Sequence, residues 1–179
     1  VGKTEPKYWL QAVTQFPSHP RTIDIARVLL QKNPNQPRLQ LLLANYADER
    51  PGILPVLDNL VSKSGAQLRS QDWEAVATAY WENRQYAKAA LAYAKTPHTP
   101  RNLYRLGRGF QLSNNKAKAI AIYQQLIRAF PNAEETDAAL MNLARMTEKK
   151  QAIAYLDRII SRFPNSAGTA LEKKADILD

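Results

Sequence analysis

Few side chains in this sequence are of the types that perform catalysis. There are two histidines, His19 and His98, each in a turn that contains proline, and no cysteine. The lack of cysteine excludes disulfides, thiolate metal sites and a cysteine nucleophile. The histidines are not paired at helical spacing, so the pattern predicts no metal site. Neither a glycine-rich phosphate loop nor a nucleophile elbow is present, and we expect no cofactor.

One dense group of carboxylates could support acid–base chemistry. It consists of Glu134, Glu135 and Asp137. These residues fall in the first turn of a predicted helix, where negative charge interacts favourably with the helix dipole. The structural interpretation is therefore preferred over catalysis, and we expect no active site in this chain.

A binding face is better supported than an active site. Arg101, Tyr104 and Arg108 are spaced so that they share one face of a helix. The corresponding line in the preceding helix pair consists of Gln71, Glu74, Thr78 and Trp81. Arginine and tyrosine could hydrogen-bond to and stack on a sugar or a peptide. In the alternative interpretation, Tyr104 packs on a neighbouring helix and the arginines are merely solvated.

The elements that carry these residues are helices. Apolar residues recur at intervals of three and four almost throughout, and no stretch alternates in the manner of a strand. Helices are predicted at residues 5–16, 20–32, 37–47, 51–62, 70–83, 85–95, 99–112, 115–129, 133–146, 149–162 and 166–179. Thr99 before Pro100 predicts a helix start, as does the capping-box spacing of Asn132 and Glu135. Proline follows phenylalanine where three of the helices must end, at Pro17, Pro131 and Pro164.

The helices follow a repeated pattern. Phe130-Pro131-Asn132 recurs as Phe163-Pro164-Asn165, and Phe16-Pro17-Ser18 is a third copy. The unit that begins at Leu103 resembles the tetratricopeptide pattern in its order of large, small and aromatic residues: Leu103, Leu106, Gly107, Phe110, Ala119, Tyr123 and Pro131. The preceding unit has the same spacings, with Trp73, Val76, Ala77, Tyr80, Ala89 and Tyr93. A looser third unit has Leu140, Leu143, Ala144, Ala152, Leu156 and Pro164.

These repeats predict an all-α fold, a right-handed superhelical array of antiparallel helix pairs. Residues 1–179 are expected to form a single helical-repeat domain, with irregular pairs in 1–69 and tetratricopeptide-like repeats in 70–179. The first and last helices each lack the partner of a pair, so we expect a fragment of a longer chain.

Composition limits the partners. The net charge of +9 suits a polyanion, or the basic side chains simply solvate the helices. Nucleic acid is not expected, because no recognised binding module is present and the aromatics are not interleaved with a basic stripe. No apolar run is long enough for a membrane span.

Several stretches together resemble a known enzyme family. They are Tyr8-Trp9-Leu10-Gln11-Ala12-Val13, Phe16-Pro17-Ser18-His19-Pro20-Arg21, Asp72-Trp73-Glu74-Ala75-Val76-Ala77, Thr99-Pro100-Arg101-Asn102, Phe163-Pro164-Asn165 and Lys174-Ala175-Asp176-Ile177-Leu178. The chain looks like the helical superhelix of soluble lytic murein transglycosylases of the cyanobacterial type. The resemblance implies a periplasmic scaffold that positions peptidoglycan glycan strands. A C-terminal lysozyme-like domain with a Glu-Ser motif would cleave the MurNAc–GlcNAc bond.

The chain itself has no Glu-Ser pair, so no catalytic residue of that family can be assigned to it. The leading hypothesis is a non-catalytic scaffold, whose partners are glycan strands and the catalytic domain of its own parent chain. The alternative is a tetratricopeptide-type adaptor that binds a protein or peptide in its inner groove.

Overall fold

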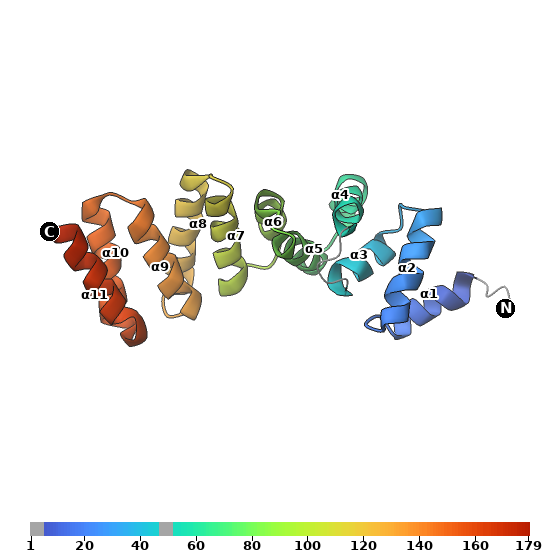
Figure 1. Ribbon diagram of the computed structural model, residues 1–179, viewed down its shortest axis with the longest axis horizontal. Coiled ribbons are helices and arrows are strands. Elements are labelled where there is room, and N and C mark those ends of the chain that lie inside the picture. The colour runs from blue at the N-terminus through green and yellow to red at the C-terminus, as the bar shows by residue number, and fades with distance from the viewer. Residues whose placement is uncertain (1–5, 47–51) are drawn as a thin grey trace. The chain divides into compact units, whose positions relative to one another are not determined.

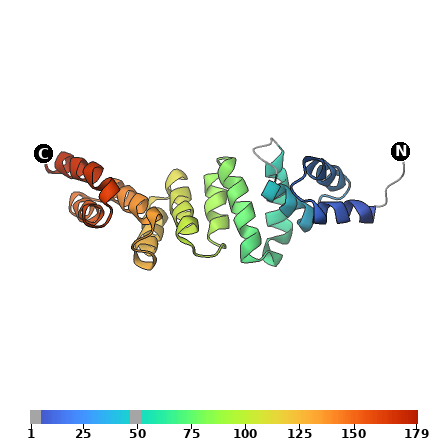
Figure 2. The same cartoon turned by 90° about the horizontal axis from the view of Figure 1, so that it is seen from below.

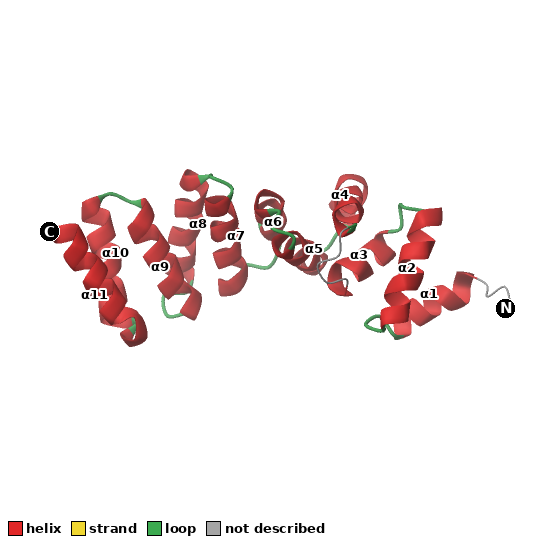
Figure 3. Ribbon diagram, in the orientation of Figure 1, coloured by secondary structure: helices red, strands yellow, loops and turns green. Residues whose placement is uncertain are grey.

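The protein is built from helices. The computed structural model describes residues 6–46 and 52–179, and within these ranges it contains eleven α-helices, a single turn of 3-10 helix and no strand (Figure 3). The predicted all-α array of helix pairs is confirmed. The helices form two compact units, residues 1–96 and residues 97–179, and each is described by itself.

The N-terminal unit contains six α-helices in its described part (Figure 1). Their bounds are α1 Pro6–Gln15, α2 Pro20–Lys32, α3 Pro37–Tyr46, α4 Ile53–Ser64, α5 Ser70–Glu82 and α6 Tyr86–Tyr93, with the 3-10 turn at Gly65–Gln67 between α4 and α5. The helix α3 contacts α2, α4 and α5. The irregular pairing expected for residues 1–69 remains a prediction.

The C-terminal unit contains five α-helices: α7 Pro100–Leu112, α8 Lys116–Ala129, α9 Glu134–Met146, α10 Lys149–Arg162 and α11 Pro164–Leu178. Each helix contacts the next one along the chain, and α9 also contacts α7. Figure 2 shows these helices after a 90° turn. In both units the observed ends lie within two residues of those predicted, apart from the predicted ends at residues 5, 47 and 51, which lie outside the described residues.

Local chemistry explains most of the helix starts. The Thr99 hydroxyl accepts a hydrogen bond from the Asn102 backbone N–H at 3.2 Å, as predicted for an N-cap before Pro100. His19 does the same for α2, since its Nδ1 accepts from the Arg21 N–H at 3.2 Å. His19 is therefore the N-cap of α2, a role that was not predicted from the sequence.

Two predicted boundaries were wrong. Asn132 does not cap α9, because Ala133 is extended and occupies the N-cap position, so the helix begins at Glu134. The Thr136 hydroxyl instead donates to the Phe130 carbonyl at 2.5 Å and holds the turn. The helix α11 begins at Pro164 rather than 166, because a proline at the first helical position needs no N–H partner.

Small residues allow the two helices of a pair to approach closely. At Gly107 an added Cβ would lie 2.8 Å from two ring carbons of Tyr123, and Tyr123 is fully buried. The glycine is therefore required for the contact between α7 and α8. Tyr93, Leu140 and Leu156, predicted from the other two repeat units, are likewise buried, whereas the predicted Phe110 is only half-buried.

Candidate functional site

The binding face predicted on α7 surrounds a buried tyrosine. Arg101 is exposed, whereas Tyr104 and Arg108 are half-buried. The ring centroid of Tyr104 lies 6.0 Å from that of Tyr123 on α8. Tyr104 thus packs on the neighbouring helix, as the alternative interpretation held, and still keeps part of its surface open to solvent.

Polar groups from three helices meet at the Tyr123 hydroxyl. This hydroxyl donates to Gln111 Oε1 on α7 at 2.9 Å and accepts from Asn142 Nδ2 on α9 at 3.3 Å. Burial raises the pKa of the Tyr123 phenol above its ordinary range, and Tyr104 adds to the increase, while Arg108 opposes it. The phenol therefore stays neutral and serves as a fixed hydrogen-bonding group.

Sequence reasoning missed Gln111 and Asn142. A signal existed for Gln111, which continues the line of Arg101, Tyr104 and Arg108 by one further step of three residues. Asn142 is a buried polar residue within an apolar run, and such residues normally have a hydrogen-bond partner. The identity of that partner, a tyrosine on another helix, was not readable locally.

The predicted line on α5 opens onto a cavity. Gln71 is exposed, and Glu74 and Thr78 are half-buried. All three line a cavity of about 330 Å³ together with Glu82 and with residues at the end of α3, Ala44 and Asn45. Among the described residues the lining contains two carboxylates and no basic side chain, so it suits a hydrogen-bond donor or a cation.

The fourth residue of that line has a different role. Trp81 is half-buried and does not line the cavity. Its ring makes edge-to-face contacts with Tyr86, at a centroid distance of 5.2 Å, and with Tyr93, at 6.3 Å. Trp81 therefore contributes to the packing between α5 and α6.

The three carboxylates considered for catalysis occupy positions that the fold explains. Glu134, Glu135 and Asp137 lie in the first turn of α9, as predicted, and Asp137 accepts a hydrogen bond from Ser166. Within residues 6–46 and 52–179 no group of three or more histidine, cysteine or acidic side chains could hold a metal ion. No helix in the same ranges is long and apolar enough to cross a membrane.

The comparisons with known proteins agree with this geometry. The profile of the tetratricopeptide repeat family matches residues 101–133 and 138–166, which correspond to the pairs α7–α8 and α9–α10. The C-terminal unit therefore contains two tetratricopeptide-like repeats. Both matches lie in the C-terminal unit. The first covers the repeat with the clearest sequence pattern, and the second covers the repeat with the loosest.

A solved structure is also similar to this chain. It is the C-terminal part of a TPR repeat-containing protein from Cytophaga hutchinsonii, with 14% sequence identity, a TM-score of 0.33, and coverage of 98% of this chain and 100% of that one. Among curated proteins, none matches the sequence. Nothing in these comparisons indicates a lytic transglycosylase.

Proposed function

We propose that this tetratricopeptide-like array is a non-catalytic interaction scaffold that binds protein partners through the solvent-facing sides of α5 and α7, the first helices of their pairs. The observation that carries the proposal is the cavity on α5, because Gln71, Glu74 and Thr78 line it together. Arrays of helical repeats commonly use such surfaces for binding. The tetratricopeptide matches in the C-terminal unit support the same kind of role.

The two first-helix faces have chemistry for different partner segments. The lining of the α5 cavity includes Glu74 and Glu82, which suit lysine or arginine side chains. The helix α7 carries Arg101, Arg105 and Arg108 and no acidic residue, which suits acidic side chains. We therefore expect a partner, or two partners, with separate basic and acidic segments.

Fluorescence anisotropy with one basic and one acidic peptide tests this proposal. The double variant Glu74→Gln/Glu82→Gln should weaken binding of the basic peptide, and Arg101→Ala/Arg108→Ala should weaken binding of the acidic one. Lys149→Gln and Glu172→Gln, which change exposed charges on α10 and α11, are the matched controls. Equal binding by all variants, or no binding of either peptide, would overturn the proposal.

A second candidate is the scaffold of a periplasmic peptidoglycan-cleaving enzyme. Its support is the sequence resemblance to lytic transglycosylases and the net charge of +9, which suits the carboxylates of peptidoglycan stem peptides. On this proposal the protein sediments with purified sacculi at low salt, is released at high salt, and never clears them. Sedimentation that is absent, or that does not respond to salt, would refute it.

A further inference from the structure

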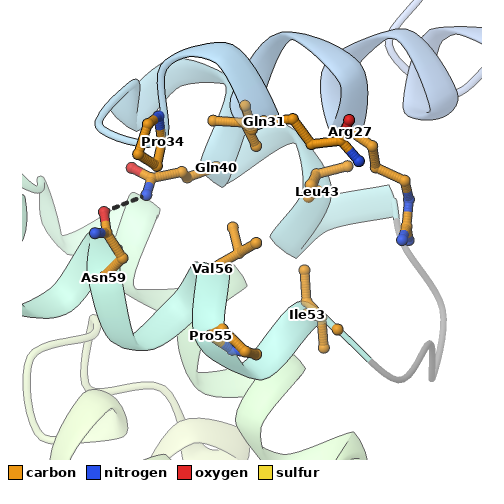
Figure 4. A pocket seen from close by; sticks show the side chains of 11 residues that line it. Arg27, Gln31, Pro34, Gln40, Leu43, Ile53, Pro55, Val56 and Asn59 are labelled. Atoms are coloured by element: carbon orange, nitrogen blue, oxygen red, sulfur yellow. Dashed lines mark hydrogen bonds between the residues drawn. The ribbon is translucent and has the colours of Figure 1, made fainter.

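Apolar side chains of α4 line two different cavities in the N-terminal unit. Val56 lies in the cavity between α2, α3 and α4, where Gln40 donates a hydrogen bond to Asn59 at 2.7 Å (Figure 4). Val61 lines a largely apolar groove of about 380 Å³ that α4, α5 and α6 form together. The other residues that define this α4–α6 groove are Trp73 and Tyr80 of α5, Lys88 and Leu91 of α6, and Lys95 in the turn after α6.

Polar contacts between the three helices hold the α4–α6 groove in shape. Asp58 on α4 accepts from Lys88 Nζ on α6 at 2.8 Å and from the Tyr80 hydroxyl on α5 at 2.6 Å. The helix α5 also packs on both α4 and α6. A surface that is already formed loses less conformational entropy on binding. The charges of Asp58 and Lys88 are paired with each other, so neither determines the charge of the partner.

An exposed leucine extends the apolar wall of the groove to the surface. Leu91 is 62% exposed, more than any other leucine among the described residues. The fold does not require a leucine here, because the corresponding residue of α8, 30 positions further on, is Ala121. A partner that covers Leu91 together with Val61 would remove a continuous apolar area from water, which favours association.

The charge available in the groove is positive and belongs to Lys95. Its ammonium lies 4.3 Å from the centre of the Trp73 ring, a cation–π contact. Among the described residues no carboxylate pairs with Lys95, and residues 84–98 contain no aspartate or glutamate. A lysine ammonium has three N–H donors, and the ring contact leaves donors for an acceptor. The groove is therefore complementary to an apolar group with a carboxylate beside it.

We propose that the α4–α6 groove binds an acidic amphipathic helix of a partner protein. Apolar side chains of that helix lie against Val61 and Leu91, and a carboxylate in its next turn accepts from Lys95. Grooves between helices commonly hold the apolar face of a further helix. The groove shares no residue with the cavity on the solvent-facing side of α5, so it is a second contact surface of the scaffold.

Fluorescence anisotropy on the full chain tests the proposal with three matched peptides. The reference is an alanine-based helical peptide with two leucines one turn apart and a glutamate in the following turn. The second peptide has glutamine in place of the glutamate, and the third has alanines in place of the leucines. We expect the reference to bind about tenfold more tightly than the leucine-free peptide and roughly threefold more tightly than the glutamine peptide. Equal binding of all three, or no binding of any, would overturn the proposal.

Two substitutions locate the bound peptide. Leu91→Ala should weaken the reference peptide roughly fivefold and leave the melting temperature unchanged, since α8 carries alanine at the same place. Lys95→Gln should weaken the reference peptide but not the glutamine peptide, because the pair interaction is absent in the latter. The matched controls are Leu171→Ala on α11 and Lys32→Gln on α2, both at exposed positions. An unchanged affinity in Leu91→Ala, or equal losses of both peptides in Lys95→Gln, would contradict the assignment.

Other occupants of the groove give other results. Self-association in sedimentation velocity that Leu91→Ala abolishes would assign the groove to a second copy of the chain. Binding to vesicles of phosphatidylcholine and phosphatidylglycerol that Lys95→Gln abolishes would assign it to a lipid surface. Either result overturns the proposal.

The face on α7 also suits acidic segments, so the reference peptide is titrated against Arg101→Ala/Arg108→Ala as well. Unchanged binding is expected, and a loss confined to this variant would assign the peptide to α7 instead. The double variant Glu74→Gln/Glu82→Gln should likewise leave the affinity unchanged. Failure of the groove and failure of the first-helix faces are therefore distinguishable.

Discussion

The pair α5–α6 in the N-terminal unit and the pair α7–α8 in the C-terminal unit follow the same plan, with corresponding residues 30 positions apart. Trp73, Ala77 and Tyr93 in the first pair correspond to Leu103, Gly107 and Tyr123 in the second, and all six positions are buried. Even the turns correspond, because Arg84 and Asn114 both have positive φ, 58° and 65°. The two pairs therefore share the same buried contact positions and the same turn conformation between their helices.

The polar residues differ between the pairs. The Tyr93 hydroxyl lies 3.3 Å from Thr78 Oγ1, whereas the Tyr123 hydroxyl hydrogen-bonds to Gln111 and Asn142. The charged residues of α5 are acidic, and those of α7 are basic. Buried positions are restricted by shape and solvated positions are not, so repeats of one fold can bind different partners.

The largest effect should come from the shared tyrosines. Tyr93→Ala and Tyr123→Ala each remove a fully buried aromatic ring, and we expect each to lower the free energy of unfolding by about 3–5 kcal/mol. Urea denaturation followed by far-UV circular dichroism measures this loss. Tyr46→Ala, at an exposed position on α3, is the control and should cost less than about 1 kcal/mol. A large effect at only one of the two tyrosines would break the correspondence between the pairs.

The next effect concerns the small residue opposite the tyrosine. Gly107→Ala gains up to about 1 kcal/mol of helix propensity but forces a Cβ against the Tyr123 ring, so we expect a net loss of about 1–2 kcal/mol. Gly168→Ala in α11 is the control, since a Cβ there meets nothing within 4 Å and should stabilise by up to about 1 kcal/mol. The same urea titration compares them. Stabilisation by both alanines would show that α7 and α8 can move apart.

A smaller effect is expected at the turns. Arg84 adopts the left-handed conformation at φ 58°, which asparagine tolerates better than arginine. Arg84→Asn should therefore raise the free energy of unfolding by about 0.5 kcal/mol, and Asn114→Arg should lower it by a similar amount. Opposite shifts in the urea midpoint would support equivalent turns, and shifts of the same sign would contradict that equivalence.

The smallest effect depends on pH and comes from Asp58 on α4, which accepts hydrogen bonds from Tyr80 on α5 and Lys88 on α6. Burial would raise the pKa of Asp58, but hydrogen bonds from Lys88, at 2.8 Å, and from Tyr80, at 2.6 Å, outweigh it and leave the pKa below its ordinary value. The ionised carboxylate therefore stabilises the fold above its ordinary pKa of about 4, and this contribution is lost as the pH falls through the lower folded value.

Thermal unfolding between about pH 5 and pH 2 measures this contribution. Asp58→Asn should lose less stability on acidification than the natural chain. Tyr80→Phe makes the position like Phe110 in the other pair and should reduce the acid sensitivity by a smaller amount. An unchanged acid response in Asp58→Asn would show that Asp58 contributes nothing to it.

Much of the fold was readable from the sequence because the signals were local. The three- and four-residue period, the prolines and the Thr99 cap act within one turn of helix, and they predicted each α-helix found, though not the 3-10 turn at Gly65–Gln67. Of the candidate faces, Gln71, Glu74 and Thr78 line one cavity, since residues at helical spacing share a side. Whether these faces bind a partner stays a prediction.

What only the tertiary structure decided was how side chains from separate helices meet. Nothing near Asn142 in the sequence indicates Tyr123, and nothing near Gln40 indicates Asn59 on α4, to which Gln40 Nε2 donates. Helical periodicity fixes the direction of a side chain but not the identity of the helix that it faces. That identity depends on how each pair packs on the next, and only the packed helices determine which polar groups are paired and which remain available.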